Sequence, residues 1–259
     1  MSNKLSICML ASGSKGNAIY ISDGTTAVLL DAGLSGIEIE RRMKSKGLDP
    51  AELNAICVSH EHNDHIQGVG VLSRRFHLPV YTSARTAAAA APLMGKVAAL
   101  QSFECGSCFS IKTLALQPFA VSHDAEDPAG FTVSSNGTKI GIATDLGIAT
   151  HMVQEHLKGC TVLVLEANHD PEMLTNGPYP WPLKQRIKSR VGHLSNTASK
   201  ELLTMLQSDG LEHVILAHLS ETNNTAEKAL NEVGRALTRC KPQLWVATQD
   251  QCGELLCLK

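Results

Sequence analysis

A histidine-rich segment, residues 59–68, holds the side chains with the greatest capacity for chemistry. Its sequence is Ser-His-Glu-His-Asn-Asp-His-Ile-Gln-Gly. Three histidines and one aspartate therefore fall close together, namely His60, His62, Asp64 and His65. Imidazole and carboxylate groups together suit borderline divalent metals such as zinc, manganese or iron. A polar loop would be the simpler interpretation for a single histidine, but this spacing favours a metal site.

The segments on either side of the cluster predict how one turn presents four ligands. Residues 55–58 form an apolar run typical of a buried strand. If the strand continues to His60, then His60 and His62 point to the same side, because side chains in extended chain repeat every two residues. Apolar residues between 66 and 76 have helical spacing. Asp64 and His65 would then begin a helix and turn back toward the strand end.

Further polar residues follow other apolar runs, where a strand would deliver them to the edge of a sheet. They are Asp31 after residues 27–30, His123 after 120–122, Asp145 after 139–144 and His218 after 214–217. From the residues alone, Asp31 could also be a helix or turn cap. A lone histidine such as His123 more often satisfies hydrogen bonds than binds a metal.

The segment from His60 to His65 resembles the His-x-His-x-Asp-His signature of the metallo-β-lactamase superfamily. The resemblance implies an α/β fold, a four-layer αββα sandwich of two facing mixed sheets with outer helices, as a single domain over residues 1–259. Metals would lie at one edge of the sandwich. Asp31-Ala32-Gly33 also resembles the family's Asp-x-Gly, which implies that the Asp31 carboxylate supports the metal histidines from behind.

The same resemblance implies two divalent metal ions per chain, zinc, manganese or iron, with a bridging hydroxide as the attacking group. One metal would be held by His60, His62 and His123, the second by Asp64, His65 and His218, and Asp145 would bridge them. Asp64 and His193 are the catalytic candidates.

Two segments containing His-Leu-Ser compete for the last metal position. His218 follows an apolar strand that would deliver it rigidly to the sheet edge. His193 follows basic and polar residues and precedes a helix cap. We therefore assign His218 to the metal and His193 to substrate contact or proton transfer.

Segments such as Glu-Ala-Asn-His-Asp (166–170) and Tyr-Pro-Trp-Pro-Leu-Lys-Gln-Arg-Ile (179–187) resemble the YycJ/WalJ/VicX branch of the superfamily. That branch implies a metal-dependent phosphodiester hydrolase, a 5′-to-3′ DNA exonuclease acting on DNA ends. Alternatives are a small-molecule cyclic phosphodiesterase, a tRNA-processing endonuclease and, from another class, a non-catalytic metal-binding regulatory protein. A complete ligand set favours an enzyme, and the chain lacks a long insertion that would grip RNA.

The basic stretch 184–190 and two polar turns are the predicted substrate contacts. A net charge of −2 gives no overall attraction to a polyanion, so such a site must be local. Phosphate would be bound by Lys184 and Arg186, together with Ser195, Asn196, Ser220 and Asn223. A solvated helix is an equally weighted interpretation of the basic stretch.

Composition sets the remaining expectations. No run of 18 apolar residues predicts a membrane span, and residues 1–7 do not resemble a signal peptide. The eight cysteines are scattered, several within apolar runs, which favours free buried thiols in a reducing compartment and a cytoplasmic location. Cys105 and Cys108 form a lone Cys-x-x-Cys without the second pair of a zinc ribbon. No oligomeric state is predicted.

Overall fold

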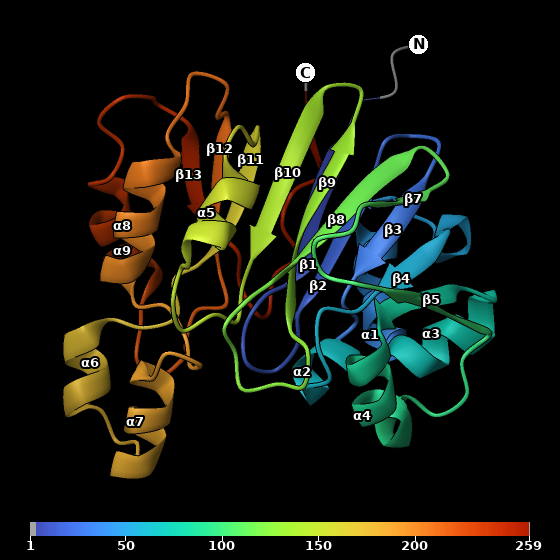
Figure 1. Cartoon of the computed structure of the whole chain (residues 1–259), viewed down its shortest axis with the longest axis horizontal. Coiled ribbons are helices and arrows are strands. Elements are labelled where there is room, and N and C mark those ends of the chain that lie inside the picture. The colour runs from blue at the N-terminus through green and yellow to red at the C-terminus, as the bar shows by residue number, and fades with distance from the viewer. Residues whose placement is uncertain (1–3, 259) are drawn as a thin grey trace.

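The computed structural model describes residues 4–258, in which two seven-stranded sheets pack face to face with helices on both outer sides (Figure 1). The first sheet has the order β14 (Leu256–Cys257), β1 (Ser6–Ala11), β2 (Ala18–Ser22), β3 (Ala27–Leu30), β4 (Ala55–Cys57), β5 (Pro79–Ser83) and β6 (Ala99–Phe103). The second has the order β13 (Gln243–Val246), β12 (His213–Ala217), β11 (Val162–Glu166), β10 (Thr138–Ala143), β9 (Ala129–Ser135), β8 (Leu114–Ala120) and β7 (Phe109–Ile111).

Each sheet is part antiparallel and part parallel. Short turns join the antiparallel strands, as at Asn136-Gly137 between β9 and β10, where both residues have positive φ angles. The parallel pairs, β3 to β6 and β10 to β13, need longer crossover connections. Parallel strands end on the same side of their sheet, so the residues after β3, β4, β10, β11 and β12 gather at one edge.

Helices cover the outer faces of both sheets. The first sheet is covered by α1 (Gly36–Ser45), α2 (Asn63–Ile66), α3 (Val69–Phe76) and α4 (Ala84–Met94), and the second by α5 (His151–Leu157), α8 (Asn196–Leu206) and α9 (Ala226–Gly234). Two short helices, α6 (Pro171–Asn176) and α7 (Trp181–Lys188), stand apart at the lower left of Figure 1. A 3-10 turn spans Pro50–Glu52.

The apolar side chains form three layers, one between the sheets and one under each set of helices. The middle layer takes residues from both sheets, among them Ile7 and Leu30 from the first and Phe131 and Ile215 from the second. Both sheets contribute to this core, and the predicted four-layer αββα sandwich is confirmed.

Local expectations differ from the structure where one residue changes the path of the chain. The predicted helix from Asp64 to residue 76 is broken at Gly68, whose N–H donates to the carbonyl of Ala32 and whose Cα packs against the backbone of Leu34. The last helix begins at Ala226, where the Thr225 hydroxyl caps it by accepting from Lys228 N–H.

Candidate metal centre

The metal-binding turn leaves the first sheet earlier than expected. Strand β4 ends at Cys57 and does not reach His60, so His60 and His62 lie in the connection before α2. The turn is placed by hydrogen bonds to the residues after β3: Ala32 N–H donates to the carbonyl of His65 over 2.8 Å. Gly33 allows this approach, because a Cβ there would lie 1.6 Å from the carbonyl oxygen of Asp64.

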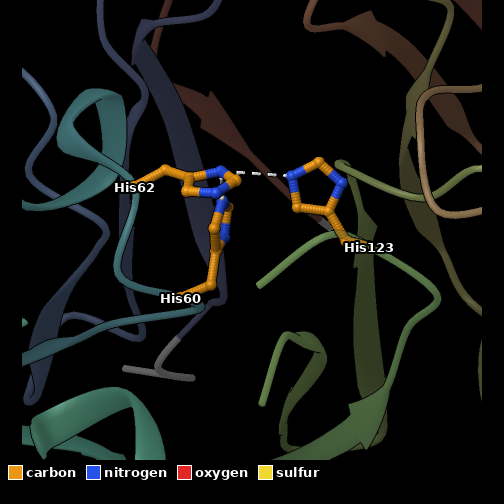
Figure 2. A group of neighbouring side chains, drawn as sticks. All are labelled: His60, His62 and His123. Atoms are coloured by element: carbon orange, nitrogen blue, oxygen red, sulfur yellow. Dashed lines mark hydrogen bonds between the residues drawn. The ribbon is translucent and has the colours of Figure 1, made fainter. Parts of the chain in front are cut away.

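Three imidazoles converge on one point at the edge between the sheets (Figure 2). His62 Nδ1 lies 3.1 Å from His60 Nε2 and 3.2 Å from His123 Nε2. In a tetrahedral site with metal–nitrogen bonds of roughly 2.0–2.1 Å, neighbouring nitrogens are about 3.3 Å apart. The other ring nitrogen of His123 faces the carbonyl of Gly192 at 3.2 Å, which leaves Nε2 for a metal. The three nitrogens therefore have the spacing of ligands.

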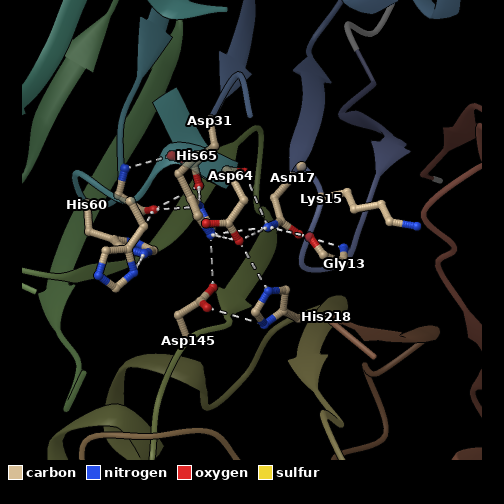
Figure 3. Close-up of polar contacts among 12 residues, drawn as sticks. Gly13, Lys15, Asn17, Asp31, His60, Asp64, His65, Asp145 and His218 are labelled. Carbon is tan, nitrogen blue, oxygen red and sulfur yellow. Dashed lines mark hydrogen bonds and ion pairs between the residues drawn. The ribbon is translucent and has the colours of Figure 1, made fainter. Parts of the chain in front are cut away.

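A second group of side chains lies beside the first (Figure 3). Asp64 Oδ2 is 3.6 Å from both His65 Nε2 and His218 Nε2. Asp145 lies between the two groups, with Oδ2 3.3 Å from His65 Nε2 and Oδ1 3.9 Å from His123 Nε2. The structure thus brings together all seven residues assigned to metals, from both sheets.

Two buried atoms of this centre lack a hydrogen-bond partner among the described residues. They are Asp145 Oδ2 and His218 Nε2, and both face the second group. An unpaired buried polar atom costs about 1–3 kcal/mol, so such atoms usually have a partner. A carboxylate oxygen and an imidazole lone pair can both bind a divalent cation. The donor set and its orphaned atoms therefore fit metal ions.

Asp31 fixes the back of the centre. Its Oδ2 accepts from His65 Nδ1 and from the Ser59 hydroxyl, both over 2.8 Å, and its Oδ1 accepts from Ser59 N–H over 2.8 Å. With Nδ1 as the donor, His65 presents Nε2 as a lone pair toward Asp64 and Asp145. Asn17, which the sequence did not single out, lies at the same place, with its amide 3.1 Å from His65 Nε2.

Glu166 is a further residue of the centre that sequence reasoning missed. It ends β11 and is fully buried. One carboxylate oxygen accepts from His193 Nδ1 at 2.8 Å and His218 Nδ1 at 2.9 Å, while the other accepts backbone N–H groups of Leu146 and Leu194. Burial alone would raise its pKa, but these donors outweigh burial and hold the pKa of Glu166 at about 2. The sequence feature that could have identified Glu166 is a carboxylate at the end of an apolar run.

Opposite charges also shift the pKa values of Asp145 and His193. Burial would raise the pKa of Asp145, yet His218 and His65 hold that pKa well below its usual range. Burial would lower the pKa of His193, but Glu166 raises it above the usual value. His193 lies between the two ligand groups, with its ring 5.2 Å from the rings of both His123 and His218.

The backbone is strained where the strands deliver their ligands. Asp31, Asp145 and His218 follow strands β3, β10 and β12 and have φ angles of 59°, 57° and 56°. This left-handed region is uncommon for residues other than glycine and costs about 1 kcal/mol or more. The tertiary structure holds all three in place at the same edge of the two-sheet sandwich.

A pocket of about 240 Å³ adjoins the centre. Its walls include Ser14, Asp124, Asn168, Tyr179, Leu183, Arg186, Ile187, Gly192, His193 and Ser220. Arg186 Nε pairs with Asp124 Oδ2 at 2.5 Å, and the hydrogen bond from Arg186 keeps the pKa of Asp124 low against its partial burial. Lys184 does not line the pocket, because its ammonium donates to the carbonyl of Thr175 in α6.

The two polar turns proposed to contact substrate have mainly structural roles. Asn196 and Asn223 are fully buried, so neither side chain offers exposed surface to a substrate. Asn196 exchanges two 2.9 Å hydrogen bonds with Asn224. The Ser195 hydroxyl caps α8 by accepting from Ala198 N–H. Of this set only Ser220, which is 8% exposed, lines the pocket.

The chain is similar to proteins of one superfamily along most of its length. A family model described as "Beta-lactamase superfamily domain" matches residues 26–219. Exodeoxyribonuclease YycJ of Bacillus anthracis is 38% identical over 235 residues, which cover 90% of this chain and 89% of that protein. Exodeoxyribonuclease WalJ of Streptococcus pneumoniae serotype 2 is 36% identical over 225 residues, covering 85% and 84%.

Solved structures agree on the fold. The metallo-β-lactamase fold protein YhfI from Bacillus subtilis has a TM-score of 0.76 at 14% identity, covering 96% of this chain and 98% of its own. A diphosphatase from the PhnP family has a TM-score of 0.70 at 16% identity over the full length of both. Among residues 4–258, no helix has the length and apolar character to span a membrane. The chain therefore belongs to the β-lactamase superfamily, in the branch that contains the YycJ and WalJ proteins.

Proposed function

We propose that this protein is a metal-dependent phosphodiester hydrolase that degrades DNA as a 5′-to-3′ exonuclease with two divalent ions, zinc or manganese, per chain. The observation that carries the proposal is that seven candidate ligand side chains converge. Two of their buried atoms, Asp145 Oδ2 and His218 Nε2, lack a hydrogen-bond partner among the described residues. The exodeoxyribonuclease names of relatives 36–38% identical support DNA as the substrate. Eight free cysteines, five of them partly buried or exposed, support a reducing, cytoplasmic location.

His60, His62 and His123 would hold one metal, Asp64, His65 and His218 the other, and Asp145 would face both. Divalent ions bound by these residues would supply an acidified water and positive charge to offset that of the phosphate. The protein's own part is to fix these ligands before substrate arrives. Asp31 orients His65 and Glu166 orients His218, so neither imidazole must rotate to ligate.

His193 is the candidate proton donor to the leaving oxygen. Its Nδ1 is held by Glu166 at 2.8 Å, and its ring lines the pocket beside the metal centre. The carboxylate favours the protonated ring, and the ring in turn lies within reach of a phosphodiester held at the centre. Asp64 lies at the open side of the second ligand group, where its second oxygen can contact the attacking water.

Nuclease and chelator assays test the proposal. Purified protein with Mn²⁺ or Zn²⁺ should shorten a 5′-phosphorylated DNA duplex from its 5′ ends and should hydrolyse bis-p-nitrophenyl phosphate. EDTA should abolish both activities and lower the melting temperature, because metal that binds only the folded state stabilises it. Full activity after prolonged dialysis against chelator would contradict metal dependence. A protein that hydrolyses bis-p-nitrophenyl phosphate but does not cleave DNA would contradict the exonuclease assignment.

A further inference from the structure

The pocket next to the metal centre lies between that centre and helix α7. Its lining includes His193 and Ser220, from segments of the metal centre, and Tyr179, Leu183 and Ile187, from helix α7 and the residues before it. Its volume of about 240 Å³ is below the roughly 300–1,000 Å³ of pockets for drug-sized ligands. This space is on the scale of a single nucleotide rather than of a longer piece of DNA.

The walls of the pocket offer different chemistry to the two ends of a nucleotide. Tyr179 with Leu183 and Ile187 forms an aromatic and aliphatic surface, which can stack against any base. Arg186 supplies a permanent positive charge. Only its Nε is engaged by Asp124, so the two terminal NH₂ groups remain for a phosphate. Asp124 positions this guanidinium and is itself neutralised by it.

The other basic side chains of α7 point elsewhere. Lys184 and Lys188 both donate to Thr175 of α6, over 2.8 and 2.7 Å. The four positive charges of the stretch are thus not equivalent: Arg186 faces the pocket, while Lys184 and Lys188 face α6. This division provides a variant and a matched control on the same helix.

The proposed 5′-to-3′ direction decides which end of a DNA chain the pocket holds. In hydrolysis the water oxygen forms a bond to phosphorus, the bond from phosphorus to O3′ breaks, and O3′ takes a proton. With the scissile phosphate at the metal centre, the nucleotide in the adjoining pocket is the leaving group, which departs with a free 3′-hydroxyl and keeps its own 5′-phosphate. For an enzyme that cleaves from the 5′ end, that nucleotide is the 5′-terminal one.

We infer that this pocket is a subsite for one 5′-terminal nucleotide, with the base on Tyr179 and the 5′-phosphate on Arg186. The inference rests on the proposed exonuclease function. It adds that the enzyme removes one nucleotide per cleavage, releases deoxynucleoside 5′-monophosphates and favours ends that carry a 5′-phosphate.

Product analysis tests the size and polarity of the subsite. The full-length protein with Mn²⁺ is incubated with a 5′-phosphorylated oligonucleotide carrying a 3′ fluorophore, and early products are identified by mass spectrometry. We expect 5′-monophosphates and a ladder shortening by single nucleotides. Dinucleotides, longer fragments or 3′-monophosphates as the first products would overturn the subsite while leaving the exonuclease function in place. Absence of any DNA cleavage would overturn both.

Two variants and a control test the assigned contacts. Arg186→Gln should reduce the preference for 5′-phosphate over 5′-hydroxyl ends by roughly 10-fold or more, the value of a charge-assisted hydrogen bond. Tyr179→Ala should raise KM by roughly 5- to 100-fold with little change in kcat, the range of base stacking. Lys188→Gln removes the same charge from the other face of α7 and should keep the preference. Equal effects of Arg186→Gln and Lys188→Gln, or an unchanged preference in Arg186→Gln, would overturn the assignment of the phosphate.

Discussion

Glu166 offers the sharpest test of the metal centre, because Glu166→Gln changes one atom and no volume. The carboxylate accepts four hydrogen bonds, two from the imidazoles of His193 and His218 and two from the backbone N–H groups of Leu146 and Leu194. Glutamine can accept with only one of its two polar atoms. In either orientation two buried donors must face the new NH₂ group.

The free-energy cost of Glu166→Gln depends on which pair of hydrogen-bond donors loses its acceptor. If the NH₂ faces Leu146 and Leu194, two buried N–H groups lose a partner at about 1–3 kcal/mol each, or about 2–6 kcal/mol in total. If it faces the imidazoles, His218 must accept at Nδ1 and carry its proton on Nε2, which removes the lone pair intended for the metal. The substitution therefore lowers stability, metal content or both.

The assay combines thermal unfolding with metal analysis. We expect Glu166→Gln to melt at least about 4 °C lower, since a chain of about this size loses roughly 2–4 °C per kcal/mol, or to lose close to one metal per chain. Turnover should fall with either outcome. The control is Glu212→Gln, an exposed glutamate just before β12. A Glu166→Gln protein with unchanged melting temperature, metal content and turnover would refute this account of the centre.

Three further predictions follow from the same geometry. His218→Ala should lose close to one metal per chain, whereas His193→Ala should keep both and lose turnover; the reverse pattern in metal analysis would exchange their roles. Gly33→Ala should abolish metal binding or folding, because its Cβ would lie 1.6 Å from a carbonyl of the metal-binding turn, and a soluble variant with full metal content would contradict this. Glu38 has a pKa of about 2 because Arg41 hydrogen-bonds to it, against an ordinary value of 4.5. Its contribution is therefore present above pH 4.5 and lost as the pH falls toward 2, so Glu38→Gln should cost about 1 kcal/mol at pH 6, after allowance for solvent screening, and nothing near pH 2 in chemical denaturation. An equal cost at both pH values would rule out the ion pair as the cause.

The polar residues after strands were the most informative part of the sequence. Asp31, Asp145 and His218 each follow an apolar run, and the structure places all three at one edge of the two-sheet sandwich. Glu166 has the same signature and was passed over, because a strand end does not reveal what its side chain contacts. Its partners, His193 and His218, lie 27 and 52 residues away in sequence.

The basic stretch of α7 shows where a local pattern is insufficient. Four positive charges within residues 184–190, three of them in α7, indicated a phosphate site, but the directions of these side chains depend on what packs against the helix. Thr175 of α6 takes the ammonium groups of Lys184 and Lys188, and Asp124 of a distant loop takes Arg186. The same limit applies to Asn196 and Asn223, whose polar character suggested contact with substrate although both are buried.

The sequence by itself determined the fold class and the ligand types. The spacing of His60, His62, Asp64 and His65 is local, and alternating apolar runs and turns specify strands and helices through short-range preferences. Tertiary structure alone decided how these ligands meet. The approach of the turn to Gly33, the positive φ angles of Asp145 and His218, and the shared acceptor Glu166 all arise from contacts between segments far apart in the chain. Such contacts depend on the packing of the two sheets, which no local pattern encodes.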